Sequence, residues 1–269
     1  MSAMLRHLIL SASPFAIVVA FCVFNFAQRQ ESSVEAINFS KLTFEVVAFN
    51  KREFVKLEPI PLTLTLTNKT TETVLGHGAL RFSANMVRLF VAHDGGKPLT
   101  LKELSPFPKE IFVKPIEMKP GDSFHARDLL TLNLDNVFPQ PGEYEIYAVL
   151  LYPNSTAEIM SNTVTIRILE PQGVDKEAYA FIRANSRSSD FFSGRYLAGD
   201  LNAETILERF VMSYKDSVYS DYAAFLLGEL YFAQEKHEKA SELFSRLADK
   251  RDFVFADKVA NFRSKLNAK

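Results

Sequence analysis

The histidines are the first residues to test for chemistry, because they are the commonest metal ligands and general bases. The run from His237 to Ser241 begins like the H-E-x-x-H helix of a zinc protease, but Ser241 replaces the second histidine, so one metal ligand is missing. His77, His93 and His125 stand near turn signals without a second histidine, cysteine or carboxylate at ligand spacing. We therefore expect no metal site.

Other signatures of enzymes are missing as well. The chain contains no G-x-S-x-G turn, no glycine loop for phosphate and no dinucleotide fingerprint, although a site built from distant residues escapes such a search. Its only cysteine is Cys22, so the rest of the chain has no disulfide. Lys and Arg number 31 and Asp and Glu 32, with no basic stripe for nucleic acid. We expect a binding protein that is not an enzyme and has no cofactor.

The best candidate for binding is an aromatic face on a helix expected at 221–233. Ala224, Leu227, Gly228 and Tyr231 follow the spacing of one buried helix face. A second side of the same helix carries further large side chains and one carboxylate: Tyr222, Phe225, Glu229 and Phe232. An apolar second face must be covered, either by a ligand or by another part of the chain.

The elements before this helix alternate with period two and therefore predict strands. Leucines and threonines alternate through 61–67, and the same pattern recurs in 142–149 and 163–168. Weaker strands are expected at 42–48, 86–91, 110–114 and 124–132, and Asp94-Gly95-Gly96 is typical of a tight turn. About seven short strands between turn signals predict an antiparallel β-sandwich.

The segment 41–170 resembles bacterial immunoglobulin-like domains. The stretch 58–70 is similar to their second strand, and 161–168 to their closing strand. The stretch 138–150 carries Pro141, Gly142 and Tyr144, like the Pro-Gly-x-Tyr corner that opens their penultimate strand. The resemblance implies a fold but no activity, because such superfolds carry many functions.

After 171–173 the residues favour helix and repeat with a period of 34, which places Gly194 on Gly228 and Phe210 on Phe244. The better copy starts at Asp221 and is similar to the tetratricopeptide repeat of cell-envelope proteins. The residues that carry the similarity are small and large consensus positions of the two helices: Leu227, Gly228, Tyr231, Ala240 and Phe244. Ala224 and Asp252 depart from the consensus. The copy at 187–220 is degenerate, and 253–267 is expected to form a capping helix.

The resemblance gives the second face of helix 221–233 a role. In such repeats the positions of Tyr222, Phe225, Glu229 and Phe232 line the concave groove that holds a peptide. The alternative is that a helix at 203–214 covers this face in the free protein through Leu207, Val211 and Tyr214. We favour this second interpretation because the array is short.

The N-terminal residues are typical of an export signal. Arg6 and His7 precede an apolar run, 8–24, which is typical of secretion. Cleavage after Ala27 and retention of 8–27 as an inner-membrane anchor both remain open. We therefore expect a signal peptide or anchor at 1–27, a linker at 28–38, an immunoglobulin-like sandwich at 39–170 and a tetratricopeptide-like helical domain at 171–269.

These features predict an exported adaptor, periplasmic or extracellular, whose helical array binds another envelope protein or a peptide. The sandwich then acts as a spacer or docking module. One alternative makes the sandwich a carbohydrate- or surface-binding module, and another makes it a protease inhibitor. The sequence contains no tryptophan, the side chain best suited to stack on sugars, which disfavours the carbohydrate alternative. The oligomeric state stays open.

Overall fold

The structure is a computed structural model in which residues Phe39–Lys269 form one compact unit. It describes residues 41–268 except 77, 79, 81–86, 102–114, 132–133, 152–157, 186–190, 193–201 and 251. The expected signal or anchor (1–27), the linker (28–38), the strand at 110–114 and His77 lie outside the described residues. Among the described helices none is long and apolar enough to span a membrane.

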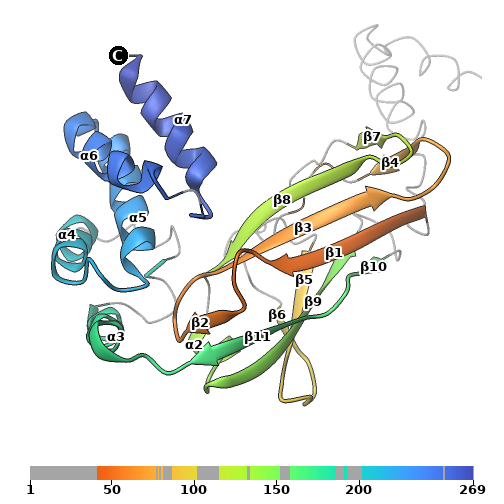
Figure 1. The fold of residues 1–269 in the computed structure, drawn as a ribbon, viewed down its shortest axis with the longest axis horizontal. Coiled ribbons are helices and arrows are strands. Elements are labelled where there is room, and N and C mark those ends of the chain that lie inside the picture. The colour runs from red at the N-terminus through yellow and green to blue at the C-terminus, as the bar shows by residue number, and fades with distance from the viewer. Residues whose placement is uncertain are drawn as a thin grey trace, which may run out of the picture. The chain divides into compact units, whose positions relative to one another are not determined.

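Two sheets build the N-terminal half of this unit (Figure 1). The smaller sheet is antiparallel with the order β1 (Leu42–Ala48), β3 (Ile60–Asn68) and β8 (Ser123–Leu130). The larger has the order β2 (Glu53–Val55), β11 (Val164–Leu169), β9 (Gly142–Leu151), β5 (Val87–His93) and β6 (Leu99–Leu101), with β10 (Glu158–Met160) also paired to β9. β4 (Val74–Gly76) and β7 (Ile116–Met118) form a separate ladder.

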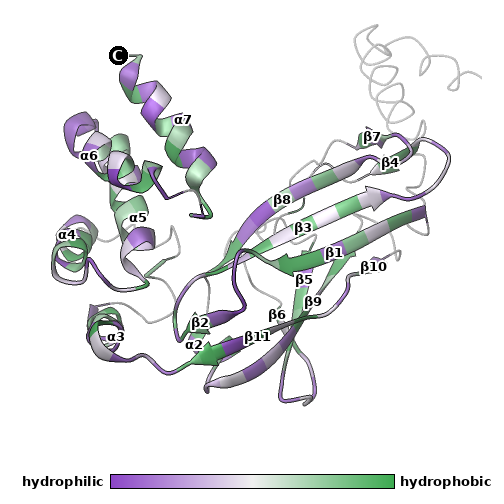
Figure 2. Cartoon of the chain, in the orientation of Figure 1, coloured by the Kyte–Doolittle hydropathy of each residue, from purple (hydrophilic) through white to green (hydrophobic). Residues whose placement is uncertain are grey.

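The period-two pattern explains how the sheets face each other. In β3 the side chains of Leu62, Leu64 and Leu66 are fully buried, while the threonines between them face outward, an alternation that Figure 2 shows along the strand. Strand β1 contacts β9, β10 and β11 of the other sheet, so the buried faces of the two sheets meet. The predicted β-sandwich is confirmed, with strands at 42–48, 60–68, 87–93, 123–130, 142–151 and 164–169.

Two local features fix the connections of the sandwich. Asp94 and Gly95 both have positive φ, and the Gly96 N–H donates to the His93 carbonyl at 2.8 Å, which closes the predicted tight turn. At the start of β9 the Tyr144 hydroxyl donates to the Gln140 carbonyl at 2.7 Å. This is the tyrosine corner of immunoglobulin-like sandwiches, so the predicted Pro-Gly-x-Tyr corner is confirmed.

Five helices follow, each in contact with the next. They are α3 (Gly173–Asn185), α4 (Ala203–Ser213), α5 (Ser220–Ala233), α6 (His237–Ala248) and α7 (Ala256–Asn267), and a short helix, α2 (Leu134–Val137), precedes β9. Only three residues join α5 to α6, so the two form an antiparallel hairpin. His237 is the first residue of α6.

The helices join the sandwich through buried and polar contacts. The Tyr219 side chain, just before α5, is fully buried, and its hydroxyl donates to the Lys56 carbonyl at 2.6 Å. The Asn50 amide donates to the Asp252 carbonyl at 2.9 Å. Both contacts connect the chain between β1 and β3 to residues far along the sequence.

Candidate binding site

The four residues predicted to line a groove all lie on one side of α5. Phe225 is almost completely buried, and Tyr222, Glu229 and Phe232 are half-buried. Helices α5 and α6 are held close at Gly228, where a Cβ would come within 2.8 Å of the Phe244 ring. The α5 and α6 backbones can therefore approach closely at Gly228, and this approach fixes where α6 lies against α5.

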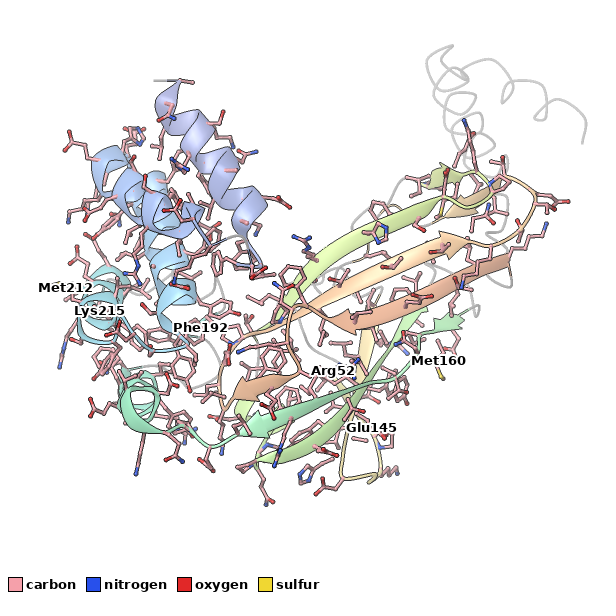
Figure 3. All side chains as sticks on the ribbon, in the orientation of Figure 1. Arg52, Glu145, Met160, Phe192, Met212 and Lys215 are labelled. Atoms are coloured by element: carbon pink, nitrogen blue, oxygen red, sulfur yellow. The ribbon has the colours of Figure 1, made fainter. Side chains whose placement is uncertain are left out.

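Aromatic side chains that follow α6 occupy this face. The Phe225 ring stacks on Phe255 with 4.5 Å between centroids and meets Phe253 edge-on at 5.9 Å. The Phe232 ring meets Phe262 of α7 at 4.9 Å. The Tyr222 ring lies near Phe253, with 5.7 Å between ring centroids, and near Phe192, with 6.1 Å between centroids. Phe192 lies on the side of the helices that faces the sandwich (Figure 3).

The cover of this face differs from the one predicted. Helix 203–214, now α4, was expected to cover it, but the ring contacts come from the segment 253–255 and from α7. Helix α4 packs on the opposite side of α5, where the Tyr231 hydroxyl donates to the Glu208 carboxylate. The reason is that α4 and α6 already pack on α5, and the segment 253–255 with α7 covers the side that these two helices leave open.

Glu229 introduces a carboxyl group into this aromatic surface. Burial raises its pKa above the usual range of a glutamate, and the nearby Lys258 ammonium opposes that shift. The Lys258 Nζ also lies 4.6 Å from the centre of the Phe255 ring and 5.8 Å from that of Phe225. Lys258 is exposed, and its cation is attracted both by the two aromatic rings and by the half-buried carboxyl group.

The five residues predicted to shape the repeat are all buried: Leu227, Gly228, Tyr231, Ala240 and Phe244. Phe244 is the central one, because its ring contacts Phe225, lies against Gly228 and stacks on Phe262 at 4.9 Å. Tyr231 faces α4 and does not line the groove. Together these residues hold α4, α5, α6 and α7 in one packed layer.

A second concavity, which the sequence did not suggest, lies between the sandwich and the start of α7. Its volume is about 780 Å³. The sandwich contributes side chains from β3 and β8, and the other wall comes from the residues that begin α7: Thr63, His125, Ala126, Arg127, Asp128, Val254, Phe255, Asp257 and Lys258. No local pattern could have predicted it, because its two walls are more than 120 residues apart in the sequence.

Both charge signs line this cleft. The Arg127 guanidinium lies 3.8 Å from the Asp257 carboxylate and 4.5 Å from the centre of the Phe49 ring. His125 is held by a hydrogen bond between its Nδ1 and the Thr65 hydroxyl at 3.0 Å. Lys258 borders both the cleft and the aromatic face of α5, so the first turn of α7 is a wall of both sites.

The comparisons with known proteins bear on the fold alone. No family model and no curated protein matches the chain. Among solved structures, a CARDB domain from Pyrococcus furiosus is similar to 48% of this chain over 94% of its own length, at 12% identity and a TM-score of 0.25. The same domain in complex with di-metal ions matches at 12% identity over 87% of its length, with a TM-score of 0.26.

A β-glucosidase from Erythrobacter marinus is similar to 48% of this chain at 12% identity, with a TM-score of 0.27, but this chain spans only 15% of that enzyme. At TM-scores this low the superpositions assign no residue a role.

Within the described ranges no three His, Cys, Asp or Glu side chains gather as a metal site would require. His93 stacks on Tyr144 at 4.5 Å, and His237 packs beside Phe232 at 5.9 Å. The cleft combines charged groups of both signs with the half-buried Phe255 ring.

Proposed function

We propose that the chain is an exported adaptor that binds another envelope protein, with a tetratricopeptide-like helical array beside an immunoglobulin-like sandwich. The period of 34 residues and the contact between Gly228 and Phe244 support the repeat assignment. The charged start and apolar run at 6–24 support export, and the segment up to Ala27 is either removed or kept as an anchor.

The observation that carries the proposal is the cleft shared by the two parts of the chain. Thr63, His125 and Arg127 form its floor on the sandwich, and Phe255 and Lys258 form its wall at α7. A segment of a partner in this cleft would contact both parts at once, so the sandwich serves as a docking surface as well as a spacer. The aromatic face of α5 is already occupied by α7, which leaves the cleft as the accessible site.

Site-specific photo-crosslinking in intact cells tests this proposal. A photoreactive residue at Thr63, on the floor of the cleft, is compared with one at Thr165, which is exposed on the outer face of the larger sheet. We expect a crosslinked partner from position 63 and not from position 165, and we expect Lys258→Glu to reduce its yield. The absence of any adduct at 63, or the same adducts at both positions, would contradict the proposed site.

The carbohydrate-binding alternative has one observation in its favour. Phe90 and Tyr147 are half-buried neighbours on the outer face of the larger sheet, and their rings stack with 4.8 Å between centroids. Each ring uses one face on the other, which leaves little aromatic area for a sugar. Binding to a glycan array that is lost in Tyr147→Ala would favour this alternative over the adaptor.

A further inference from the structure

Helix α7 fills the aromatic face of α5 with a definite sequence pattern. The contacts with α5 come from Phe255, just before α7, and from Lys258 and Phe262 within it, and Val259 is the buried residue of the helix; the four stand at positions i, i+3, i+7 and i+4. This is the spacing with which an amphipathic helix enters a groove. The two phenylalanines meet Phe225 and Phe232, and the Lys258 Nζ lies near the Phe225 and Phe255 rings and attracts the Glu229 carboxylate.

The two helices in this contact, α5 and α7, are buried to very different degrees. In α5 every residue from Ala223 to Gly228 is buried, whereas in α7 only Val259 is. Phe255 and Phe262 remain half-exposed, and the rest of α7 is mostly polar, as Figure 2 shows. A helix that buries one residue fully is held by little apolar area, so its local opening costs less than unfolding of the array.

The surface that α7 covers cannot remain uncovered. Departure of α7 would expose Phe225, Phe232 and Phe244 together, and a contiguous aromatic surface of this kind needs a replacement. Opening is therefore favourable only when another helix takes the same place. Its chemistry follows from the contacts of α7: aromatic side chains seven residues apart, with a lysine or arginine three residues after the first.

We propose that α7 is a displaceable occupant of the aromatic face of α5, and that an external helix with this pattern binds there in its place. The inference rests on the proposed adaptor function and defines a second, concealed contact site for the partner. Displacement would also separate Asp257 from Arg127, so exchange at α5 reshapes the cleft against the sandwich.

A peptide of residues 252–268, carrying a fluorescent label, is the probe for exchange. Wild-type chain should bind it weakly, because its own α7 competes at high effective concentration. Phe262→Ala weakens the internal occupant, and we expect it to raise the apparent affinity for the peptide about tenfold. Arg263→Ala, on the exposed side of α7, is the matched control and should behave as wild type.

The site and the pattern are tested by two further comparisons. Adding Phe232→Ala to Phe262→Ala should abolish the gain, with circular dichroism confirming that both variants are folded. A peptide with Lys258→Glu should bind about tenfold more weakly, whereas Arg263→Glu, the same change of charge on the exposed side, should not. Unchanged affinity in Phe262→Ala, or equal binding by the double variant, would overturn the proposal.

Three other outcomes separate this inference from its alternatives. A dimer formed by mutual exchange of α7, detected by sedimentation, would identify a second copy as the occupant and overturn the assignment to an external helix. Crosslinking of a partner at Thr63 without any peptide exchange would leave the adaptor function standing and refute only the role of α7. Peptide exchange without crosslinking at Thr63 would leave the role of α7 standing and would contradict the cleft as the binding site.

Discussion

At the scale of single residues, a few buried polar groups hold the connections of this fold. The Tyr144 side chain is almost fully buried, and its hydroxyl donates to the Gln140 carbonyl at 2.7 Å. Glu58 is almost fully buried too, with one oxygen accepting the Val55 N–H at 3.0 Å and the other 2.5 Å from the Lys51 ammonium. Buried polar groups are costly when a partner is removed.

Tyr144→Phe should lower the free energy of unfolding by about 1–2 kcal/mol, because the Gln140 carbonyl then loses its donor. Urea unfolding followed by circular dichroism measures the change. Tyr147→Phe removes the same hydroxyl from a half-buried side chain on the outer face and should change stability by less than about 0.5 kcal/mol. Equal losses of unfolding free energy in the two variants would show that the hydrogen bond of Tyr144 to Gln140 adds nothing to stability.

Glu58 makes stability depend on pH in a predictable direction. Burial raises its pKa above that of the unfolded chain, and Lys51 opposes the shift only in part. The native state then holds the proton more tightly, so the contribution of Glu58 to stability is largest below the pKa of the unfolded chain and is lost as pH rises through the raised pKa. Relative to Glu58→Gln, the wild type should lose unfolding free energy between pH 4 and pH 8. A difference that grew in the other direction would refute this account.

At the scale of elements, the packing of α5 on α6 depends on a missing side chain. Gly228 gives α5 a lower helix propensity than alanine would, by about 1 kcal/mol. Its place opposite Phe244 explains the glycine, because a Cβ there would lie 2.8 Å from a ring carbon that cannot move away. Phe244 is fully buried between Phe225 and Phe262.

Gly228→Ala should therefore destabilise the protein by about 1 kcal/mol net, since overpacking costs more than the helix propensity returns. Thermal and urea unfolding measure the effect. In a Phe244→Leu background the same substitution should cost much less, because the smaller side chain can yield. A cost that is independent of Phe244 would place the strain elsewhere.

At the scale of the whole molecule, two kinds of contact join the helices to the sandwich. The Tyr219 side chain is fully buried and its hydrogen bond to the Lys56 carbonyl is partly buried, whereas the ion pair of Arg127 with Asp257 is exposed. Exposed ion pairs contribute little to stability, and buried hydrogen bonds contribute more. The first contact therefore holds the two parts together, while the second lies in the proposed binding cleft.

Tyr219→Phe should lower the unfolding free energy by about 1–2 kcal/mol, and the sandwich and the helices should then unfold less cooperatively. Scanning calorimetry should then show a broader transition. Arg127→Ala should change stability by less than about 0.5 kcal/mol while reducing partner crosslinking at Thr63. A large loss of stability in Arg127→Ala would mean that this arginine is structural.

Much of the fold could be predicted from local patterns. The alternation of Leu and Thr in 61–67 predicted β3, the Pro-Gly-x-Tyr run predicted the corner at Tyr144, and Asp94-Gly95-Gly96 predicted a turn with positive φ. These features depend on residues within a few positions of one another, and the backbone chemistry of glycine, proline and alternating side chains determines them. Strands of three residues, such as β2, escaped prediction because they are too short to show a period.

The sequence by itself determined the two kinds of architecture and the residues that shape the α5–α6 contact. Only the tertiary structure decided that α7 covers Phe225 and Phe232, that β8 and α7 enclose a cleft, and that Tyr219 reaches Lys56. The physical reason is sequence distance, since Asn50 and Asp252, which are hydrogen-bonded, are 202 positions apart. An amphipathic face shows that it will be covered, but the cover is chosen by the packing of the whole chain.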